Sequence, residues 1–261
     1  MRYFIELAYN GGAYHGWQRQ DGAISVQEVL ETGLKYKMGQ EGGLTGCGRT
    51  DTGVHARQFF AHFDHSREFQ NQELEAFTEA LNRFLPKDIT LYRIFKVNDS
   101  AHARFDARAR TYKYYINQQK NPFTTNLGWN YHVDFNLEKM NAAAAILKTY
   151  TDFTSFAKLH TDVKTNNCKV SEAWWEQSGG QMIFTITADR FLRNMVRAVV
   201  GTLVQVGREK ITIDDLHAII QSKNRSKAGM SVAAAGLFLH KVVYDWDKIL
   251  DLGIKSSFLI L

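Results

Sequence analysis

One aspartate, Asp51, stands in a setting where a carboxylate can do chemistry. It lies between Gly48 and Gly53 in the segment GRTDTGVHA, two residues after Arg49. An arginine beside a loop carboxylate holds it in one orientation, which suits a nucleophile. A turn in which Asp51 bonds only its own loop backbone explains the same residues. The segment by itself leaves both interpretations open.

Tyr112 is the second candidate, on a segment with the period of a strand. Alternation along the run RTYKY puts Arg110, Tyr112 and Tyr114 on one face. One ring can then reach a cleft while the other packs, although core packing of both fits the pattern too.

Three arginines in the second half form a third candidate. If the apolar period of FLRNMVRAVVGTLVQVG marks a helix, Arg190, Arg193 and Arg197 fall at i, i+3 and i+7 along one side. A basic stripe of this kind suits contact with a polyanion, but an ordinary amphipathic surface shows it as well.

Other patterns resemble reactive sites without fitting them. His55, His62 and His65 lie near Asp64, yet their spacings match none of the recurrent zinc patterns. Cys47 has no activating base beside it in the sequence. The chain has no dinucleotide fingerprint and no Walker phosphate loop. The sequence therefore predicts neither a metal nor a cofactor.

The segment AYHGWQRQ, residues 13–20, mixes aromatic, polar and basic side chains. Such mixtures suit stacking on RNA bases and contact with phosphates. A loop held in place by a buried Trp17 is the alternative.

Composition limits the classes of partner and of compartment. The chain has 261 residues, a formal net charge of +5 and a pI of about 9.1, which favours a polyanionic partner. Two cysteines are too few for a disulfide framework and indicate a reducing compartment. The first residues lack the features of a signal peptide, and no apolar run approaches about eighteen residues. We expect a cytoplasmic protein without a membrane span.

Hydrophobic periodicity places the candidate residues on regular elements. Arg2–Tyr9 alternates as a strand does, and Ser25 and Glu28 have the spacing of a capping box that begins a helix. The further predicted elements are strands at 58–64, 88–97, 108–118 and 236–244, a hairpin over 168–188, and helices over 74–84, 140–150, 191–207 and near 214–220. Asp51 then lies on a glycine-rich loop that leads into a strand.

This order of elements predicts an α+β protein. We expect two similar α+β halves, residues 1–103 and 104–261, each with a mainly antiparallel sheet and helices on one face. The aspartate loop then belongs to the first half, and the tyrosine strand and arginine helix to the second. A site that uses all three lies in a cleft between the halves.

Five segments together make the sequence resemble the TruA family of pseudouridine synthases. The segment GRTDTGVHA is similar to the family's GRTDxGVHA, and four more match in the expected order: YNGGAYHGWQRQ, HARFDARARTYKYYI, DRFLRNMVRAVVGTL and AAAGLFLHKVVY. Three positions depart from the family's pattern. Thr52 stands where the family usually has alanine, Asn10 where it often has aspartate, and Ala233 where proline is common. None of these departures removes a group that the chemistry requires.

The resemblance implies an activity and a role for each candidate. It implies isomerisation of uridine to pseudouridine in the anticodon stem-loop of tRNA, at positions 38, 39 and 40, without a cofactor. Asp51 matches the family's catalytic aspartate, Tyr112 the tyrosine that stacks on the target base, and Arg197 the partner of the aspartate. Arg49 is expected to engage the flipped nucleotide and its phosphate. The family also implies a homodimer, with one tRNA spanning both subunits.

Two alternatives remain at this stage. Basic residues cluster within 104–113, 190–197 and 223–227. These clusters would also suit an RNA-binding protein without catalysis, although the joint presence of Asp51, Tyr112 and Arg197 argues against that. A pseudouridine synthase that acts on another RNA would carry the same residues.

Overall fold

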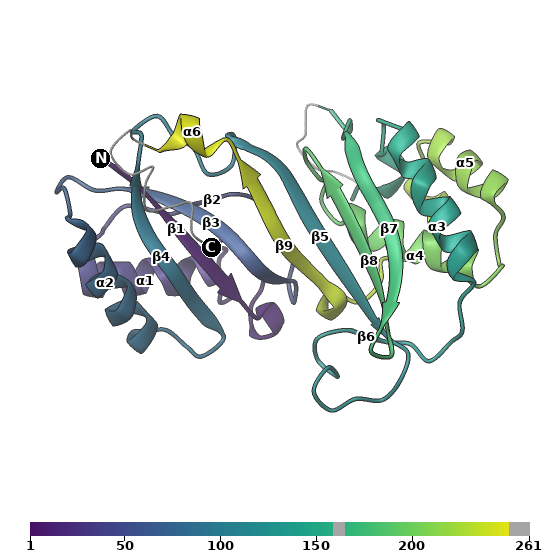
Figure 1. Cartoon of the computed structure of the whole chain (residues 1–261), viewed down its shortest axis with the longest axis horizontal. Coiled ribbons are helices and arrows are strands. Elements are labelled where there is room, and N and C mark those ends of the chain that lie inside the picture. Colours follow the sequence, from purple (N-terminus) through teal and green to yellow (C-terminus); the bar gives the residue numbers. More distant parts are fainter. Residues whose placement is uncertain (159–164, 251–261) are drawn as a thin grey trace. The chain divides into compact units, whose positions relative to one another are not determined.

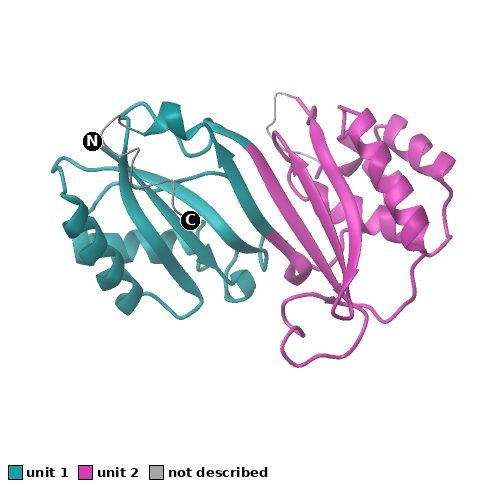
Figure 2. Ribbon diagram, in the orientation of Figure 1, with its two compact units in different colours: residues 1–108, 239–261 teal, residues 109–238 magenta. Residues whose placement is uncertain are grey.

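The computed structural model describes residues 1–158 and 165–250, which divide into two units (Figure 2). Unit 1 consists of residues 1–108 and of the chain from 239 onward, and unit 2 of residues 109–238. The chain leaves unit 1 within strand β5 (Ala107–Asn117) and returns to it within β9 (Leu237–Tyr244). Most of the last strand therefore belongs to unit 1, whereas the expected division at residues 103 and 104 assigns it to the second half.

Unit 1 is built on an antiparallel sheet. Its strands, in spatial order, are β4 (Ile89–Val97), β1 (Arg2–Tyr9), β3 (His55–Asp64) and β9, with the short β2 (Thr45–Gly46) paired to β3. In the central strand, Ile5 lies opposite Ala61 on β3 and opposite Ile94 on β4. The strand predicted from the alternation at Arg2–Tyr9 is confirmed.

Two helices of unit 1 begin and end where local chemistry dictates. Helix α1 (Val26–Met38) starts at Ser25, whose side chain accepts a hydrogen bond from the backbone N–H of Glu28. Helix α2 (Asn71–Phe84) ends before Pro86, as predicted. The two helices pack against each other, and α2 also packs on β4 (Figure 1). The remaining short elements of the unit are η1 (Gly11–Ala13) and α6 (Trp246–Ile249).

The described part of unit 2 has its own antiparallel strands and three α-helices. The strands are β5, β8 (Gln181–Ala188) and β7 (Val170–Ser178), in this order, with the short β6 (Trp129–Asn130) parallel to β5. The predicted hairpin is confirmed, and Gly179 and Gly180 form its turn with φ angles of 56° and 74°. The helices are α3 (Leu137–Ile146), α4 (Met195–Gly207) and α5 (Ile213–Gln221), and the 3-10 helices are η2 (Leu147–Thr149), η3 (Thr154–Phe156), η4 (Arg225–Lys227) and η5 (Ala234–Gly236). Helix α3 packs on β7 and on α4.

Helix α4 begins later than its apolar period predicts. The predicted start is residue 191, but Asn194 has a left-handed backbone with φ 66°, and the helix begins at Met195. A left-handed residue cannot lie inside a right-handed helix, so residues 191–193 are not helical. This late start places Arg190 and Arg193 before the helix.

The predicted α+β class and the mainly antiparallel sheet are confirmed. In the part of the chain that the structure describes, no helix has the length and apolar character needed to cross a bilayer.

Candidate active site

Asp51 lies in the loop between β2 and β3 of unit 1, with a half-buried side chain. The N–H of Val54 donates to the carbonyl of Asp51 at 3.1 Å, and Gly53 has φ 77°. These features close a tight turn from which β3 starts at His55. The glycine-framed loop predicted around Asp51 is therefore present, and it leads directly into a strand.

The residue before Asp51 is held by a second loop, residues 10–17. The N–H of Trp17 donates to the carbonyl of Thr50 at 3.3 Å, and the hydroxyls of Tyr9 and Thr50 share a hydrogen bond of 2.9 Å. Gly16 approaches so closely that a Cβ atom there would lie 2.3 Å from the Thr50 carbonyl oxygen. The backbone at Asp51 is thus fixed by packing against a neighbouring segment.

The aromatic residues of the segment 13–20 are part of the core. Trp17 is 2% exposed and stacks on Phe59, with ring centroids 4.1 Å apart. The Tyr14 hydroxyl donates to Asp88 at 2.6 Å, and burial, reinforced by that hydrogen bond, raises the pKa of Tyr14. The alternative of a loop held by a buried Trp17 is the correct one. The exposed residues of the segment are Ala13, His15, Gln18, Arg19 and Gln20.

Arg49 lies two residues before Asp51 in the same loop, and it is exposed. Thr50 between them is 8% exposed. The loop therefore carries a cation on its surface, next to a buried residue that anchors the backbone.

Tyr112 lies on β5 in unit 2, opposite Ile186 of β8. Its half-buried ring meets Phe191 edge to face, with centroids 5.0 Å apart at an interplanar angle of 85°. Tyr114 on the same strand is fully buried. Of the two tyrosines, the structure thus leaves only Tyr112 partly accessible.

Arg197 lies in the first turn of α4 in unit 2 and is half-buried. Its Nε donates to the carbonyl of Val232 at 2.7 Å. This bond fixes the plane of the guanidinium within unit 2.

The predicted basic stripe is wrong, because Arg190 and Arg193 precede the helix that carries Arg197. The left-handed Asn194 separates them, so the three arginines do not follow one helical side. Arg193 is exposed and Arg190 half-buried.

Known proteins similar to this chain cover almost all of it. A family model described as tRNA pseudouridine synthase matches residues 143–245, which include Arg197 but not Asp51 or Tyr112. The tRNA pseudouridine synthase A of Porphyromonas gingivalis is 51% identical over 251 residues, covering 95% of this chain and 99% of that protein. The enzyme of the same name from Bacteroides fragilis is 52% identical over 94% of this chain and 96% of its own length. The one from Thermoanaerobacter pseudethanolicus is 39% identical over 92% of this chain and 98% of its own length.

The chain belongs to the tRNA pseudouridine synthase A family. The protein is therefore an isomerase. The resemblance drawn from the five segments is confirmed. Asp51 and Arg49 lie in unit 1, and Tyr112 and Arg197 lie in unit 2.

Two of the clustered histidines of this family member, His55 and His62, form hydrogen bonds that support the fold. Nδ1 of His62 accepts from the N–H of Ala103 at 3.1 Å, and Nδ1 of His55 accepts from Gly11 at 3.0 Å. Burial, with a smaller effect of the Arg2 charge, lowers the pKa of His62 to about 4, so the ring is neutral near pH 7. Within residues 1–158 and 165–250, no group of three His, Cys, Asp or Glu side chains is arranged to hold a metal ion.

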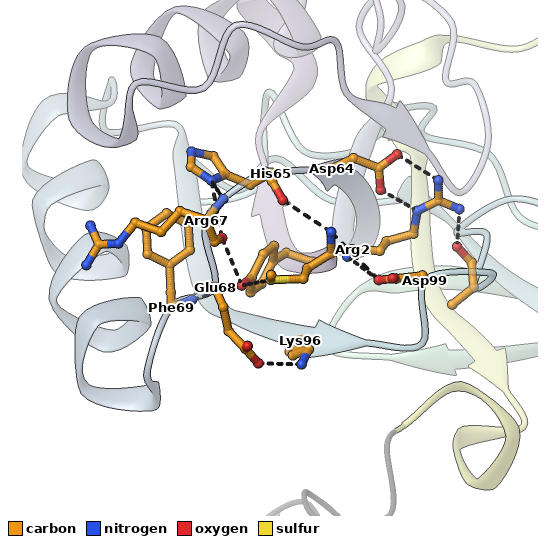
Figure 3. A network of polar contacts seen from close by, with 11 residues as sticks. Arg2, Asp64, His65, Arg67, Glu68, Phe69, Lys96 and Asp99 are labelled. Atoms are coloured by element: carbon orange, nitrogen blue, oxygen red, sulfur yellow. Dashed lines mark hydrogen bonds and ion pairs between the residues drawn. The ribbon is translucent and has the colours of Figure 1, made fainter.

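Asp64, the carboxylate near those histidines in the sequence, forms a structural ion pair with Arg2 (Figure 3). Arg2 donates to both of its carboxylate oxygens, at 2.7 and 2.8 Å, and also to the carbonyl of Ala101 at 2.8 Å. The hydrogen bond from Arg2 holds the pKa of Asp64 below its usual value. This network joins β1 and β3 to the connection that follows β4.

The sequence interpretation missed the residues that hold Arg197. Asn194 and Val232 carry no chemical signal of their own. The segment AAAGLFLHKVVY, singled out by resemblance, begins one residue after Val232. The sequence does not show that this part of the chain lies beside α4; the fold does.

Proposed function

We propose that the protein isomerises uridine to pseudouridine in the anticodon stem-loop of tRNA, at positions 38, 39 and 40, with Asp51 as the catalytic residue. The reaction breaks the bond between C1′ and N1 and forms one between C1′ and C5. The proton on C5 leaves and N1 gains a proton, so no redox partner or group donor is needed.

One observation carries the proposal. The backbone at Asp51 is fixed by Trp17, Tyr9 and Gly16, whereas its carboxylate side chain stays partly exposed, in a chain that belongs to this family. A group on a fixed backbone with a partly accessible side chain is what positioning for catalysis requires. The relatives' name, tRNA pseudouridine synthase A, supports tRNA as the substrate.

The other candidates take supporting roles in this proposal. A base cannot react inside a stem, so the target uridine is flipped out, which costs a few kcal/mol in lost stacking and pairing. The partly accessible ring of Tyr112 stacks on the flipped base, and Arg49 contacts the phosphate of its nucleotide. Arg197 takes the role of partner of the aspartate that the family resemblance assigns to it. Asp51 starts the reaction at C1′, at C6 or by removing a proton from C2′, and the residues present are compatible with each route.

Release of tritium from tRNA labelled at uridine C5 tests the proposal. Asp51→Ala is expected to abolish release while tRNA binding changes by less than about threefold, because the carboxylate acts on the reacting atoms and not on the phosphates. Asp21→Ala, which removes an exposed loop aspartate of the same unit, is the control and should release tritium at the normal rate. Appreciable turnover by Asp51→Ala would refute the role of this residue.

The same assay separates the alternatives. An RNA-binding protein without catalysis releases no tritium from any RNA. A synthase for another RNA releases it from that RNA but not from tRNA. Mapping of pseudouridine in the treated tRNA then identifies which of the three positions react.

We also propose that the protein acts as a homodimer that binds one tRNA across both subunits. Family membership is the support for this proposal. Light scattering at the working concentration tests it, and a monomer mass would contradict it.

A further inference from the structure

A short segment after η4 holds Arg197 by an exchange of hydrogen bonds. We call Ser231, Val232 and Ala233 the Val232 cradle. Arg197 Nε donates to the Val232 carbonyl at 2.7 Å, and the N–H of Val232 donates back to the Arg197 carbonyl at 3.3 Å. Val232 itself is fully buried. Both polar groups of one peptide residue are therefore committed to Arg197.

On one side, the cradle is fixed by Tyr114. The Tyr114 hydroxyl donates to the carbonyl of Ala233 at 2.8 Å. Burial raises the pKa of Tyr114, while the positive charge of Arg197 acts in the opposite direction, which shows that the charge lies near this hydroxyl. The ring is itself confined by Gly236, where a Cβ atom would lie 2.6 Å from Tyr114 Cζ.

On the other side, the cradle is fixed by Ser231. Its hydroxyl oxygen accepts from Asn194 Nδ2 at 2.5 Å and from Arg225 Nη2 at 2.9 Å. Arg225 also donates to the carbonyl of Gly229 at 3.1 Å. The left-handed backbone of Asn194, which delays the start of α4, thus brings an amide onto the cradle three residues before Arg197.

This arrangement limits how Arg197 can bind a carboxylate. A guanidinium offers two edges for a two-point hydrogen bond, one through Nε and one through the two terminal nitrogens. Since Nε donates to Val232, the edge through Nε is engaged within unit 2. The orientation of the whole guanidinium therefore depends on where the Val232 carbonyl lies.

We propose that Tyr114 and Ser231 are positioning residues for the reaction, which act by fixing the carbonyl that orients Arg197. Neither contacts the substrate in this scheme. The inference rests on the proposed role of Arg197 toward Asp51.

Tyr114→Phe tests the inference, because it removes only the hydroxyl that holds Ala233. Loss of one such hydrogen bond is expected to lower kcat by about 3- to 10-fold, with the KM for tRNA unchanged within about twofold. Tyr150→Phe is the matched control: its hydroxyl bonds His217 at 2.7 Å in the same unit, away from the cradle. The inference is wrong if Tyr114→Phe lowers kcat no more than Tyr150→Phe does. If Tyr114→Phe does not fold, as judged by its melting transition, Ser231→Ala replaces it in the same comparison.

A double-mutant cycle distinguishes positioning from a general loss of structure. Lysine has no Nε–H to donate to Val232, so in the Arg197→Lys background Tyr114→Phe should add less than about twofold. An undiminished effect in that background overturns the inference. If Arg197→Lys has no measurable turnover, the comparison with Tyr150→Phe decides. Full activity of Asp51→Ala, in contrast, would remove the proposed function itself, so the two failures are distinguishable.

Discussion

Gly16→Ala is the sharpest test of how the fold positions Asp51. A Cβ atom at residue 16 would lie 2.3 Å from the Thr50 carbonyl oxygen, and real Cβ atoms essentially never approach closer than 3.0 Å. Residue 16 and the carbonyl must therefore separate by at least the difference, 0.7 Å. Thr50 directly precedes Asp51, so any part of this shift that Thr50 takes up displaces the carboxylate. A misplacement of about 1 Å at a reacting group costs about 100-fold in rate, and we expect kcat to fall by about 10- to 100-fold with little change in KM.

Gly22→Ala is the matched control for this substitution. Both glycines have a left-handed backbone, with φ 86° at Gly16 and 73° at Gly22, but nothing lies within 4 Å of a Cβ atom at Gly22. Each variant should lose about 1 to 2 kcal/mol of stability from the unfavourable φ, which lowers the melting temperature by about 2 to 4 °C per kcal/mol. Only Gly16→Ala should lose tritium release at a temperature where both are folded. Normal kcat in Gly16→Ala, or an equal loss in Gly22→Ala, would refute the reasoning.

Three further outcomes are expected. Burial lowers the pKa of His62 from 6.5 to about 4, so between those pH values only the unfolded chain binds this proton, and the free energy of unfolding should fall as the pH drops through that window. His62→Asn keeps an acceptor for the N–H of Ala103 and should make this fall smaller. Denaturant unfolding at about pH 7 and about pH 5 measures the difference. Arg49→Ala should lower kcat/KM for tRNA by about tenfold, whereas Arg83→Ala, which removes only a surface ion pair with Glu79, should not change it. Protein dialysed against a chelator, without any added cofactor, should release tritium at the undiminished rate, and loss of activity restored by a metal would contradict the expectation.

Elements with strong local signals could be predicted from the sequence. The start of α1 follows from Ser25 capping Glu28, and the turn at Gly179 and Gly180 from the φ angles that glycine adopts readily. The start of α4 could not be predicted, because the apolar period continues back to Phe191 through Asn194. The left-handed conformation of Asn194 accompanies a hydrogen bond to Ser231, which lies 37 residues later in the chain.

The same distinction applies to the candidate site. The resemblance of five segments was sufficient to name Asp51, Tyr112 and Arg197 as candidates, although residue type and spacing alone left other interpretations open. What fixes them was not visible, since Thr50 meets Gly16 and Tyr114 meets Ala233 across 119 residues. Whether Trp17 stacks on RNA or packs in the core was equally undecided, because an aromatic ring serves both purposes until its neighbours are known.

In both units, a glycine lies in close contact with a backbone carbonyl near a candidate residue. In unit 1, Gly16 meets the Thr50 carbonyl next to Asp51. In unit 2, a Cβ atom at Gly201 would lie 1.9 Å from the carbonyl oxygen of Met230, which directly precedes the Val232 cradle. Neither glycine can touch substrate through a side chain, so substitutions there should act on the placement of the reacting groups and reduce kcat more than substrate affinity. If backbone contacts position the site, substitution of either glycine should therefore lower kcat. The chemistry of the reaction alone would not predict this effect.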